Sequence, residues 1–334
     1  MNSRTIRALD IGYGLIKFTR SHLRTDSSLD LGSFPTYAEL AYSESRDPSQ
    51  FTVNSEGVLF FMGSKSIDLS AGNARQFLEP SFFDSMHCVA LALGAMANMK
   101  IPVSGIIDVL AIGLPMRVMV SKSTVKNLES KLLGDHVLPD LISGGDRKVT
   151  VKSTKFFVQQ EAATSLTFQP AEGASPQKYN LYIDAGYVNL SWLTKNEQKS
   201  ISDKTSSIVG GVTDLMEPML ARMKPDAFQN LRIRKRLDDA MRKQIPTIKV
   251  DGKEFEVAKY LPILEAKVSE NVSQILSNVG PIAKISKVYM SGGGAYLYHR
   301  KICEMFPKKT IFAPHSMSHF DAVRGLQMLA EMQN

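Results

Sequence analysis

The sequence predicts an α/β protein built from two related domains, and three observations lead to this prediction. The 334 residues of the chain correspond to about two domains at roughly 150 residues per domain. Strand-like and helix-like segments alternate along most of the chain, which is typical of α/β architectures. The segment RALDIGYGLIKF at 7–18 is echoed by LYIDAGYVNLSW at 181–192. Together they favour two duplicated α/β halves, each with one copy of the repeated segment.

The two echoing segments are predicted to be β-hairpins. Each is an apolar β-type run that reaches Asp-X-Gly-Tyr and continues into a second apolar run. Asp and Gly between two such runs mark a tight turn, and a repeated unit indicates related domains. The alternative is two unrelated hairpins that share the motif by chance. The matched flanking runs favour duplication.

The first half continues with mixed elements. Residues 31–61 read as β-rich loops, and 82–99 as a long apolar helix whose methionines belong to the core. The run IIDVLAIGL at 106–114 is apolar and bounded by Gly and Pro, as a buried parallel strand would be. A helix at 123–133 and β-type residues at 148–158 follow.

The second half is richer in helices. Helices are expected at 210–223, 226–243 and 258–278, with a hairpin turn at 250–253. An apolar strand at 285–290 runs into Ser291-Gly292-Gly293-Gly294 and then a helix. A last helix is expected at 320–332, after Ser318 and His319.

Composition excludes several classes of protein. With 43% hydrophobic and 22% charged residues, the chain is neither disordered, collagen-like nor a coiled coil. The net charge of +7 is a modest excess, favouring diffuse surface charge over a phosphate-gripping patch. Cys88 and Cys303 form no CxxC pair, which favours a reducing, cytoplasmic location. No apolar run reaches the roughly 18 residues of a membrane span, and no signal peptide is expected.

The first hairpin turn has the residues of a phosphate loop. Gly12 and Gly14 let backbone amides approach a phosphate closely. Lys17 lies on the second strand, where it can point the same way as Asp10. A lysine point charge suits phosphates, and an aspartate suits hydrated Mg²⁺. The alternative is an ordinary hairpin with a solvated lysine, and this segment alone does not decide between the two.

Two later segments have matching chemistry. The second turn repeats Asp184 and Gly186, and two carboxylates at one site repel unless a cation lies between them. The strand ending in Gly292-Gly293-Gly294 presents amides and a helix start to an anion or ring. The alternatives are a plain turn for Asp184 and a plain loop for the glycines. The pairing of Asp184 with Asp10 favours function.

The order of these segments resembles the actin/sugar-kinase/heat-shock ATPase superfamily. DxGxGxxK, then DxG with β flanks, then an apolar strand ending in GGG are similar to its phosphate-1, phosphate-2 and adenosine motifs. The details resemble plasmid-borne bacterial actins of the ParM/StbA type: DIGYG with IK, Gly113-Leu114-Pro115, IDAGY with Trp192 following, and Gly210-Gly211 before a helix. The resemblance spans nearly the whole chain.

This resemblance implies a role for each matching residue. Asp10 and Asp184 would hold Mg²⁺ through water, and Lys17 would face the phosphates. Glu161 would position the attacking water, with Gln160 as the alternative, and Asp184 would take part in catalysis. Small residues in the helix at 321–326 would allow a close helix crossing at the hinge. The nucleotide would contact Asp10, Gly12, Tyr13, Gly14, Lys17, Asp184, Gly186, Asn189, Gly210, Gly211, Gly292, Gly293 and Gly294.

The resemblance also implies fold, partners and function. The expected fold is actin-like: two duplicated, ribonuclease-H-like α/β domains around a nucleotide cleft. Domain I would be 1–164 with a returning helix at 319–334, and domain II 165–318. The chain would be a filament-forming ATPase, using ATP or GTP with Mg²⁺, that segregates plasmid DNA through a small DNA-binding adaptor. The alternatives are a small-molecule kinase of the same superfamily and a nucleotide-binding filament scaffold with weak hydrolysis. Ser191 favours slow hydrolysis, since relatives have a carboxylate near this position.

The basic stretch at 232–236, with Arg242 and Lys243, is interpreted as a solvated helix face. Asp238 and Asp239 interrupt it and no aromatic residues are interleaved, which disfavours direct nucleic-acid binding. A filament contact or a contact at the edge of the nucleotide is the next interpretation. The histidines lack the spacing of a metal site.

Overall fold

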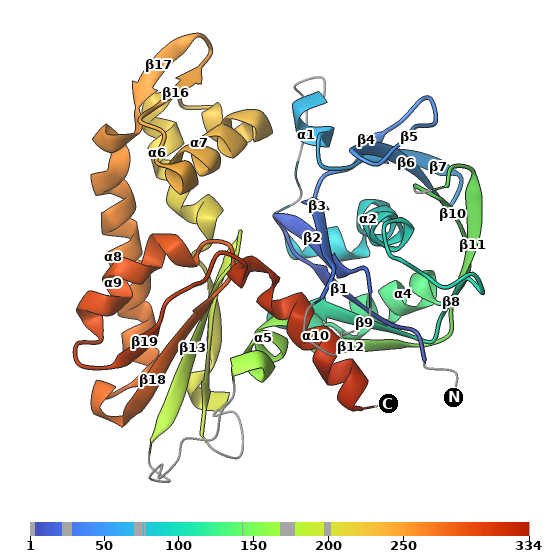
Figure 1. Ribbon diagram of the computed structural model, residues 1–334. Helices are drawn as coiled ribbons and strands as arrows, with labels where there is room; N and C mark the ends of the chain where they lie inside the picture. Colours follow the sequence, from blue (N-terminus) through green and yellow to red (C-terminus); the bar gives the residue numbers. More distant parts are fainter. Residues whose placement is uncertain are drawn as a thin grey trace. The chain divides into compact units, whose positions relative to one another are not determined.

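Two five-stranded sheets organise the chain, one in each of two units (Figure 1). The computed structural model describes residues 4–21, 29–69, 76, 78–141, 143–167, 178–196 and 202–333. Unit 1 is Met1–Leu166 with Phe320–Asn334, and unit 2 is Thr167–His319. The interpretation of residues 1–164 and 165–318 as actin-like domains I and II stays a prediction.

Unit 1 is built from strands with helices on both faces of the main sheet. Its strands are β1 (Ile6–Ile11), β2 (Leu15–Thr19), β3 (Leu31–Pro35), β4 (Glu39–Leu40), β5 (Arg46–Asp47), β6 (Gln50–Ser55), β7 (Val58–Met62), β8 (Ile106–Ile107), β9 (Val109–Leu114), β10 (Gly134–Pro139), β11 (Asp146–Val151) and β12 (Thr154–Val158). Its helices are α1 (Ser66–Leu69), η1 (Pro80–Asp84), α2 (Met86–Ala97), α3 (Met116–Met119), α4 (Lys122–Leu132), α5 (Gln159–Thr167), η6 (Ser318–Phe320, at the unit boundary) and α10 (Asp321–Met332).

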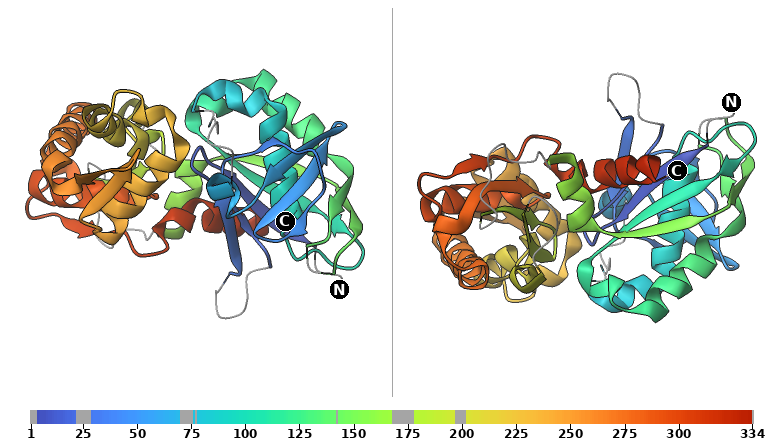
Figure 2. Two further views of the ribbon diagram at one scale, coloured as in Figure 1. Left: turned by 90° about the horizontal axis from the view of Figure 1, so that it is seen from above. Right: turned by 90° about the horizontal axis from the view of Figure 1, so that it is seen from below.

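The main sheet of unit 1 has the order β12-β9-β1-β2-β3. β1 and β2 form the predicted hairpin, and β9 and β12 continue the sheet in parallel with β1. α10 packs along β1 and β9, while α2 packs against β1 and β2 (Figure 2). All six residues of β1 are buried, as expected for a strand whose two faces are both covered.

Three expectations for unit 1 need correction. The predicted strand at 106–114 is two strands, because β8 pairs with β11 in a separate small sheet while β9 joins the main sheet. Asp108 marks the break, where its carboxylate accepts from the amide of Thr5 at 2.9 Å. The expected loops at 31–61 contain five strands. The helix expected at 82–99 is divided by Ser85, whose hydroxyl caps α2.

Unit 2 has fewer strands and longer helices. Its strands are β13 (Tyr179–Ala185), β14 (Asn189–Lys195), β15 (Ser206–Val209), β16 (Thr247–Val250), β17 (Lys253–Glu256), β18 (Ile285–Ser291) and β19 (Thr310–Phe312). Its helices are η2 (Ser202–Lys204), α6 (Val212–Met223), η3 (Ala227–Gln229), α7 (Leu231–Lys243), η4 (Val257–Tyr260), α8 (Leu261–Val279), η5 (Ile282–Lys284) and α9 (Ala295–Met305).

The main sheet of unit 2 has the order β15-β14-β13-β18-β19. β13, β14 and β15 are antiparallel, whereas β18 and β19 run parallel to β13. Starting from β3, the unit 1 sheet repeats this order and these strand directions. The internal echo in the sequence therefore reflects two sheets of one topology, and not a chance match of two hairpins.

Two expectations in unit 2 have different outcomes. The helix expected at 226–243 is interrupted, because Asn230 caps α7 by accepting from the amides of Arg232 and Ile233. The hairpin expected at 250–253 is present between β16 and β17. Asp251 and Gly252 have φ of 49° and 81°, the left-handed pair of a type I′ turn.

The crossing of α10 over α5 gives a stability prediction. A Cβ placed on Gly325 would lie inside van der Waals contact with the carbonyl of Ala162. We expect Gly325→Ala to lower the free energy of unfolding by about 1–3 kcal/mol, because the two backbones cannot separate without disturbing the core. The control Met332→Ala, at a side chain that is 76% exposed at the end of α10, should change the free energy of unfolding by less than about 0.5 kcal/mol. Denaturant unfolding of both variants tests this, and equal losses would contradict the close crossing.

Candidate functional site

In both units, the turn aspartate lies at the carboxyl end of a strand that has a parallel neighbour. Asp10 is paired in register with Gly113 of β9, and Asp184 with Ser291 of β18. In open α/β sheets, ligands bind outside the carboxyl ends of parallel strands. The topology thus places the predicted first, second and third motifs at the ligand-binding edges of their sheets.

Asp10 is the centre of a polar group in unit 1. Its carboxylate is 1% exposed and lies 2.5 Å from the Lys17 ammonium through Oδ2. Gln159 donates from Nε2 to Asp10 Oδ1 at 2.6 Å and to the carbonyl of Ile11 at 3.0 Å. The alternative of a solvated lysine is therefore wrong, since the Lys17 side chain is 16% exposed and paired.

The start of α5 provides three consecutive polar residues with different environments. Gln159 contacts Asp10 and was missed by the sequence analysis, which named Gln160 and Glu161. Gln160 is 5% exposed, and its Oε1 has no hydrogen-bond partner. Glu161 is exposed. The signal for Gln159 was its place directly after β12, because the first residue beyond a parallel strand faces the same edge as Asp10.

The phosphate-1 turn is tightly packed. A Cβ on Gly12 would lie 2.9 Å from the carbonyl of Leu15. Thr36 holds the turn from outside, donating its amide to the carbonyl of Gly14 at 3.0 Å and its hydroxyl to that of Gly12 at 2.5 Å. The Tyr13 side chain packs edge-on against Phe83 at 5.4 Å, and burial raises its pKa to about 12. Tyr13 can therefore serve a ligand only through its backbone.

In unit 2 the second and third motifs are in direct contact. Gly292 has φ of 90°, and a Cβ there would overlap the carbonyl of Ala185 and Oδ1 of Asp184. Gly294 donates its amide to the carbonyl of Ala185 at 2.7 Å. The backbone of the glycine turn therefore lies directly against the carboxylate of Asp184.

Gly210 and Gly211 fit α6 against the second turn. A Cβ on Gly211 would lie 2.5 Å from the carbonyl of Tyr187. The amides of Val212 and Thr213 donate to the carbonyls of Gly186 at 3.1 Å and Tyr187 at 2.9 Å. The first amides of α6 are therefore engaged by the turn, which gives the two glycines a structural role.

The position at which a further carboxylate was expected is closed. Asn189 accepts from the amide of Gly186 at 2.8 Å through its carbonyl. Ser191, opposite Asp184 in the hairpin, is buried and its hydroxyl lies 2.8 Å from that of Ser207. The second turn therefore has one carboxylate, Asp184.

Helix α7 adds a charged cluster that the sequence analysis treated as solvated surface. Arg242 donates from Nε to Asp238 Oδ1 at 2.9 Å and from Nη1 to the carbonyl of Gly293 at 2.6 Å. Its guanidinium lies 4.8 Å from the ring centroid of Tyr296, whose hydroxyl is 3.3 Å from Asp238 Oδ1. Burial raises the pKa of Asp238 even though Arg242 opposes the shift. Arg242 therefore contacts the glycine turn, and a contact with a nucleotide at this place stays a prediction.

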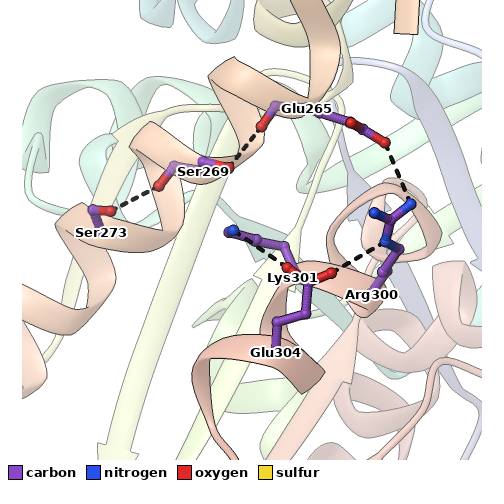
Figure 3. A network of polar contacts seen from close by, with 6 residues as sticks. All are labelled: Glu265, Ser269, Ser273, Arg300, Lys301 and Glu304. Atoms are coloured by element: carbon purple, nitrogen blue, oxygen red, sulfur yellow. Dashed lines mark hydrogen bonds and ion pairs between the residues drawn. The ribbon is translucent and has the colours of Figure 1, made fainter. Parts of the chain in front are cut away.

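Helix α9, which begins at the glycine turn, is tied to α8 by a surface network (Figure 3). Arg300 contacts Glu265 at 3.4 Å and Glu304 at 3.1 Å, and Lys301 contacts Glu304 at 3.3 Å. Exposed pairs of this kind each contribute less than about 1 kcal/mol. Beside them lies a mostly apolar pocket of about 610 Å³ that includes Tyr296 and residues of α7, η4, α8 and α9.

Two adjacent glycines allow a test of the turn geometry. Gly292→Ala should lower the free energy of unfolding by about 1–3 kcal/mol, because a side chain there is strained and overlaps Asp184. In Gly293→Ala the new Cβ would meet nothing closer than 3.8 Å, and we expect a change within about 0.5 kcal/mol. Thermal unfolding of the two variants measures the difference. Similar values would show that the turn does not depend on the close approach.

Comparisons with known proteins agree with this architecture. Residues 8–160, just under half of the chain, match the family profile described as "Actin like proteins N terminal domain". No curated protein sequence matches the chain. The crystal structure of Ta0583, an archaeal actin homologue, has a TM-score of 0.73 at 20% identity, covering 99% of this chain and 100% of its own.

Two further structures add information about ligands and assemblies of such proteins. The ADP complex of Ta0583 has a TM-score of 0.72 at 19% identity, with 98% of this chain and 99% of that chain covered. A ParM from Clostridium botulinum, solved as a 15-stranded filament, has a TM-score of 0.72 at 14% identity, with 99% of each chain covered. The chain therefore has the actin-like fold over its whole length, as the order of its motifs predicted.

Proposed function

We propose that this protein binds ATP and Mg²⁺, hydrolyses the nucleotide and assembles with copies of itself into filaments. The observation that supports this most is the repeated placement of an aspartate at the carboxyl end of a strand, beside a turn that contains half-buried glycines. The two units would be actin-like domains I and II, at 1–164 with 319–334 and at 165–318. GTP in place of ATP is an outcome that the assays below would detect.

The residues present fit a magnesium nucleotide. Gly12, Gly14, Gly292 and Gly293 are half-buried, so the backbone of both turns is partly accessible to a ligand. Asp10 and Asp184 would hold Mg²⁺ through its bound water molecules, since carboxylate oxygens suit a hydrated Mg²⁺ ion. Phosphates gain from backbone amides and from the Lys17 ammonium, a compact charge suited to them. Asp238, Arg242 and Tyr296 are proposed to meet the sugar and base next to Gly293.

The chemistry follows from positioning. Bound Mg²⁺ would neutralise charge on the phosphate oxygens. Lys17, fixed by Asp10, would stabilise negative charge that develops during transfer, and Gln159 would hold Asp10 in place. Glu161, exposed at the start of α5, would accept a proton from the attacking water or orient it. Gln160, whose Oε1 lacks a partner, is the alternative for this role.

The biological role is proposed from relatives. The ParM from Clostridium botulinum forms a filament, which supports self-association of this chain. Segregation of plasmid DNA in the cytoplasm, through a small DNA-binding adaptor, is the function that the ParM-type resemblance implies. In the described part of the chain no helix is long and apolar enough to cross a membrane.

A filament scaffold with weak hydrolysis is the second candidate. The hydrogen bond between Ser191 and Ser207 occupies the place of an expected carboxylate. Without this second carboxylate, nucleotide binding would be less affected than hydrolysis.

Light scattering with parallel phosphate release, after addition of Mg²⁺-ATP, separates the candidates. We expect scattering to rise above a critical concentration and to decay as phosphate appears. A stable rise without phosphate would favour the scaffold, and no rise would refute assembly. Turnover that needs an added metabolite would instead indicate a kinase.

Substitutions distinguish binding from turnover. Glu161→Ala should slow phosphate release by about 10²–10⁴-fold while Mg²⁺-ATP affinity stays unchanged, because it removes only the group that acts on water. Asp184→Ala should abolish Mg²⁺-dependent binding. Glu254→Ala, on the exposed hairpin of β16 and β17, is the control. Unchanged turnover in Glu161→Ala with a loss in Gln160→Ala would reassign the role.

A further inference from the structure

Arg234 of α7 is a buried arginine for which the functions described above have no use. The residue is 3% exposed, although the sequence predicts that it lies on a solvated helix face. Its Nε and Nη1 are buried without a hydrogen-bond partner. Most buried polar groups are paired, so an arginine in this state requires an explanation.

The neighbours of Arg234 connect it to the candidate site. Arg234, Asp238 and Arg242 follow one another at intervals of four along α7, which places them on one helix face. Tyr187 of the second turn interacts electrostatically with all three residues. One end of this face reaches the glycine turn, where Arg242 donates to Gly293. The helix face formed by Arg234, Asp238 and Arg242 thus borders two of the three predicted nucleotide motifs.

Among the described residues, no carboxylate lies within ion-pair distance of the buried Arg234 guanidinium. The guanidinium lies 5.0 Å from the ring centroid of Phe228, an uncharged partner. Burial raises the pKa of Tyr187 to about 12, so this hydroxyl is neutral at physiological pH. Asp238 is paired with Arg242 and Tyr296. Glu217, a carboxylate that acts electrostatically on Arg234, is exposed to solvent.

We propose that Arg234 is a positioning residue whose buried positive charge is compensated by the polyphosphate of a bound nucleotide. The inference rests on the proposed function. In it, Arg234 makes the protein bind nucleotides more tightly the more negative charge they carry. A charge held in a low-dielectric interior acts over several ångströms and is weakly screened by salt. An uncompensated buried charge also destabilises the nucleotide-free protein. Arg234 therefore lowers stability without nucleotide and raises affinity for anionic nucleotides.

The test compares ligands of different charge on matched variants. Arg234→Met removes the charge and keeps much of the apolar stem. Arg236→Met, on the same helix at an exposed position, is the control. Arg234→Lys keeps the charge without the guanidinium. Binding of ATP, ADP and uncharged adenosine is measured by calorimetry, and the melting temperature of each nucleotide-free variant by circular dichroism.

We expect Arg234→Met to weaken ATP binding by about tenfold or more, ADP binding by less, and adenosine binding not at all. Its nucleotide-free melting temperature should equal or exceed that of the unaltered chain. Arg234→Lys should recover most of the ATP affinity. An equal loss for adenosine and ATP, or a lower melting temperature together with a loss for every ligand, would overturn the proposal. If the unaltered chain binds ATP and Arg234→Met binds it equally well, only this inference fails. If the unaltered chain binds no nucleotide, the proposed function fails with it.

Discussion

The two turns that carry Asp10 and Asp184 depend on one constraint, the parallel pairing of the first strand of each hairpin with its neighbour in the sheet. These pairs are β1 with β9 and β13 with β18. This pairing sets Asp10 beside Gly113 and Asp184 beside the glycine turn. In unit 2 the carboxylate then needs a neighbour with no side chain. A Cβ on Gly113 would lie 2.7 Å from Leu326 and 3.5 Å from Asp10, and one on Gly292 would overlap Asp184. Two sheets of the same strand order thus produce two comparable polar edges.

The two edges differ in how their charge is compensated. In unit 1, Asp10 is neutralised within its own hairpin by Lys17 and held by Gln159. In unit 2, Arg242 of α7, a helix that is not part of the sheet, pairs with Asp238 and donates to the carbonyl of Gly293, and Arg234 of the same helix is buried. The duplicated sheets are therefore alike in topology and unlike in electrostatics.

Much of this was predictable from the sequence, for identifiable reasons. The hairpins, β18 and the helices after them have strong local signals: apolar runs bounded by Asp and Gly. The pairing partners of short strands such as β8 and β10 were not predictable, because register depends on tertiary contacts. Gln159 was missed although it directly follows the β-type segment expected to end at 158, because the family resemblance directed attention to its two neighbours. The interpretation of the basic helix as a solvated face fails at Arg234, which is buried by packing that the charge pattern does not encode, whereas Arg236, Arg242 and Lys243 are exposed.

The proposal depends on three segments, the turns at 10–17 and 184–189 and the glycine turn with the start of α9 at 292–296, which would all bind a magnesium nucleotide. Hydrogen exchange of the backbone amides, measured with and without Mg²⁺-ATP under conditions that prevent assembly, tests it most directly. The account predicts slower exchange at these three segments and little change in the β16–β17 hairpin, which lies outside the candidate motifs. Binding of ATP accompanied by unchanged exchange at all three segments would contradict the account.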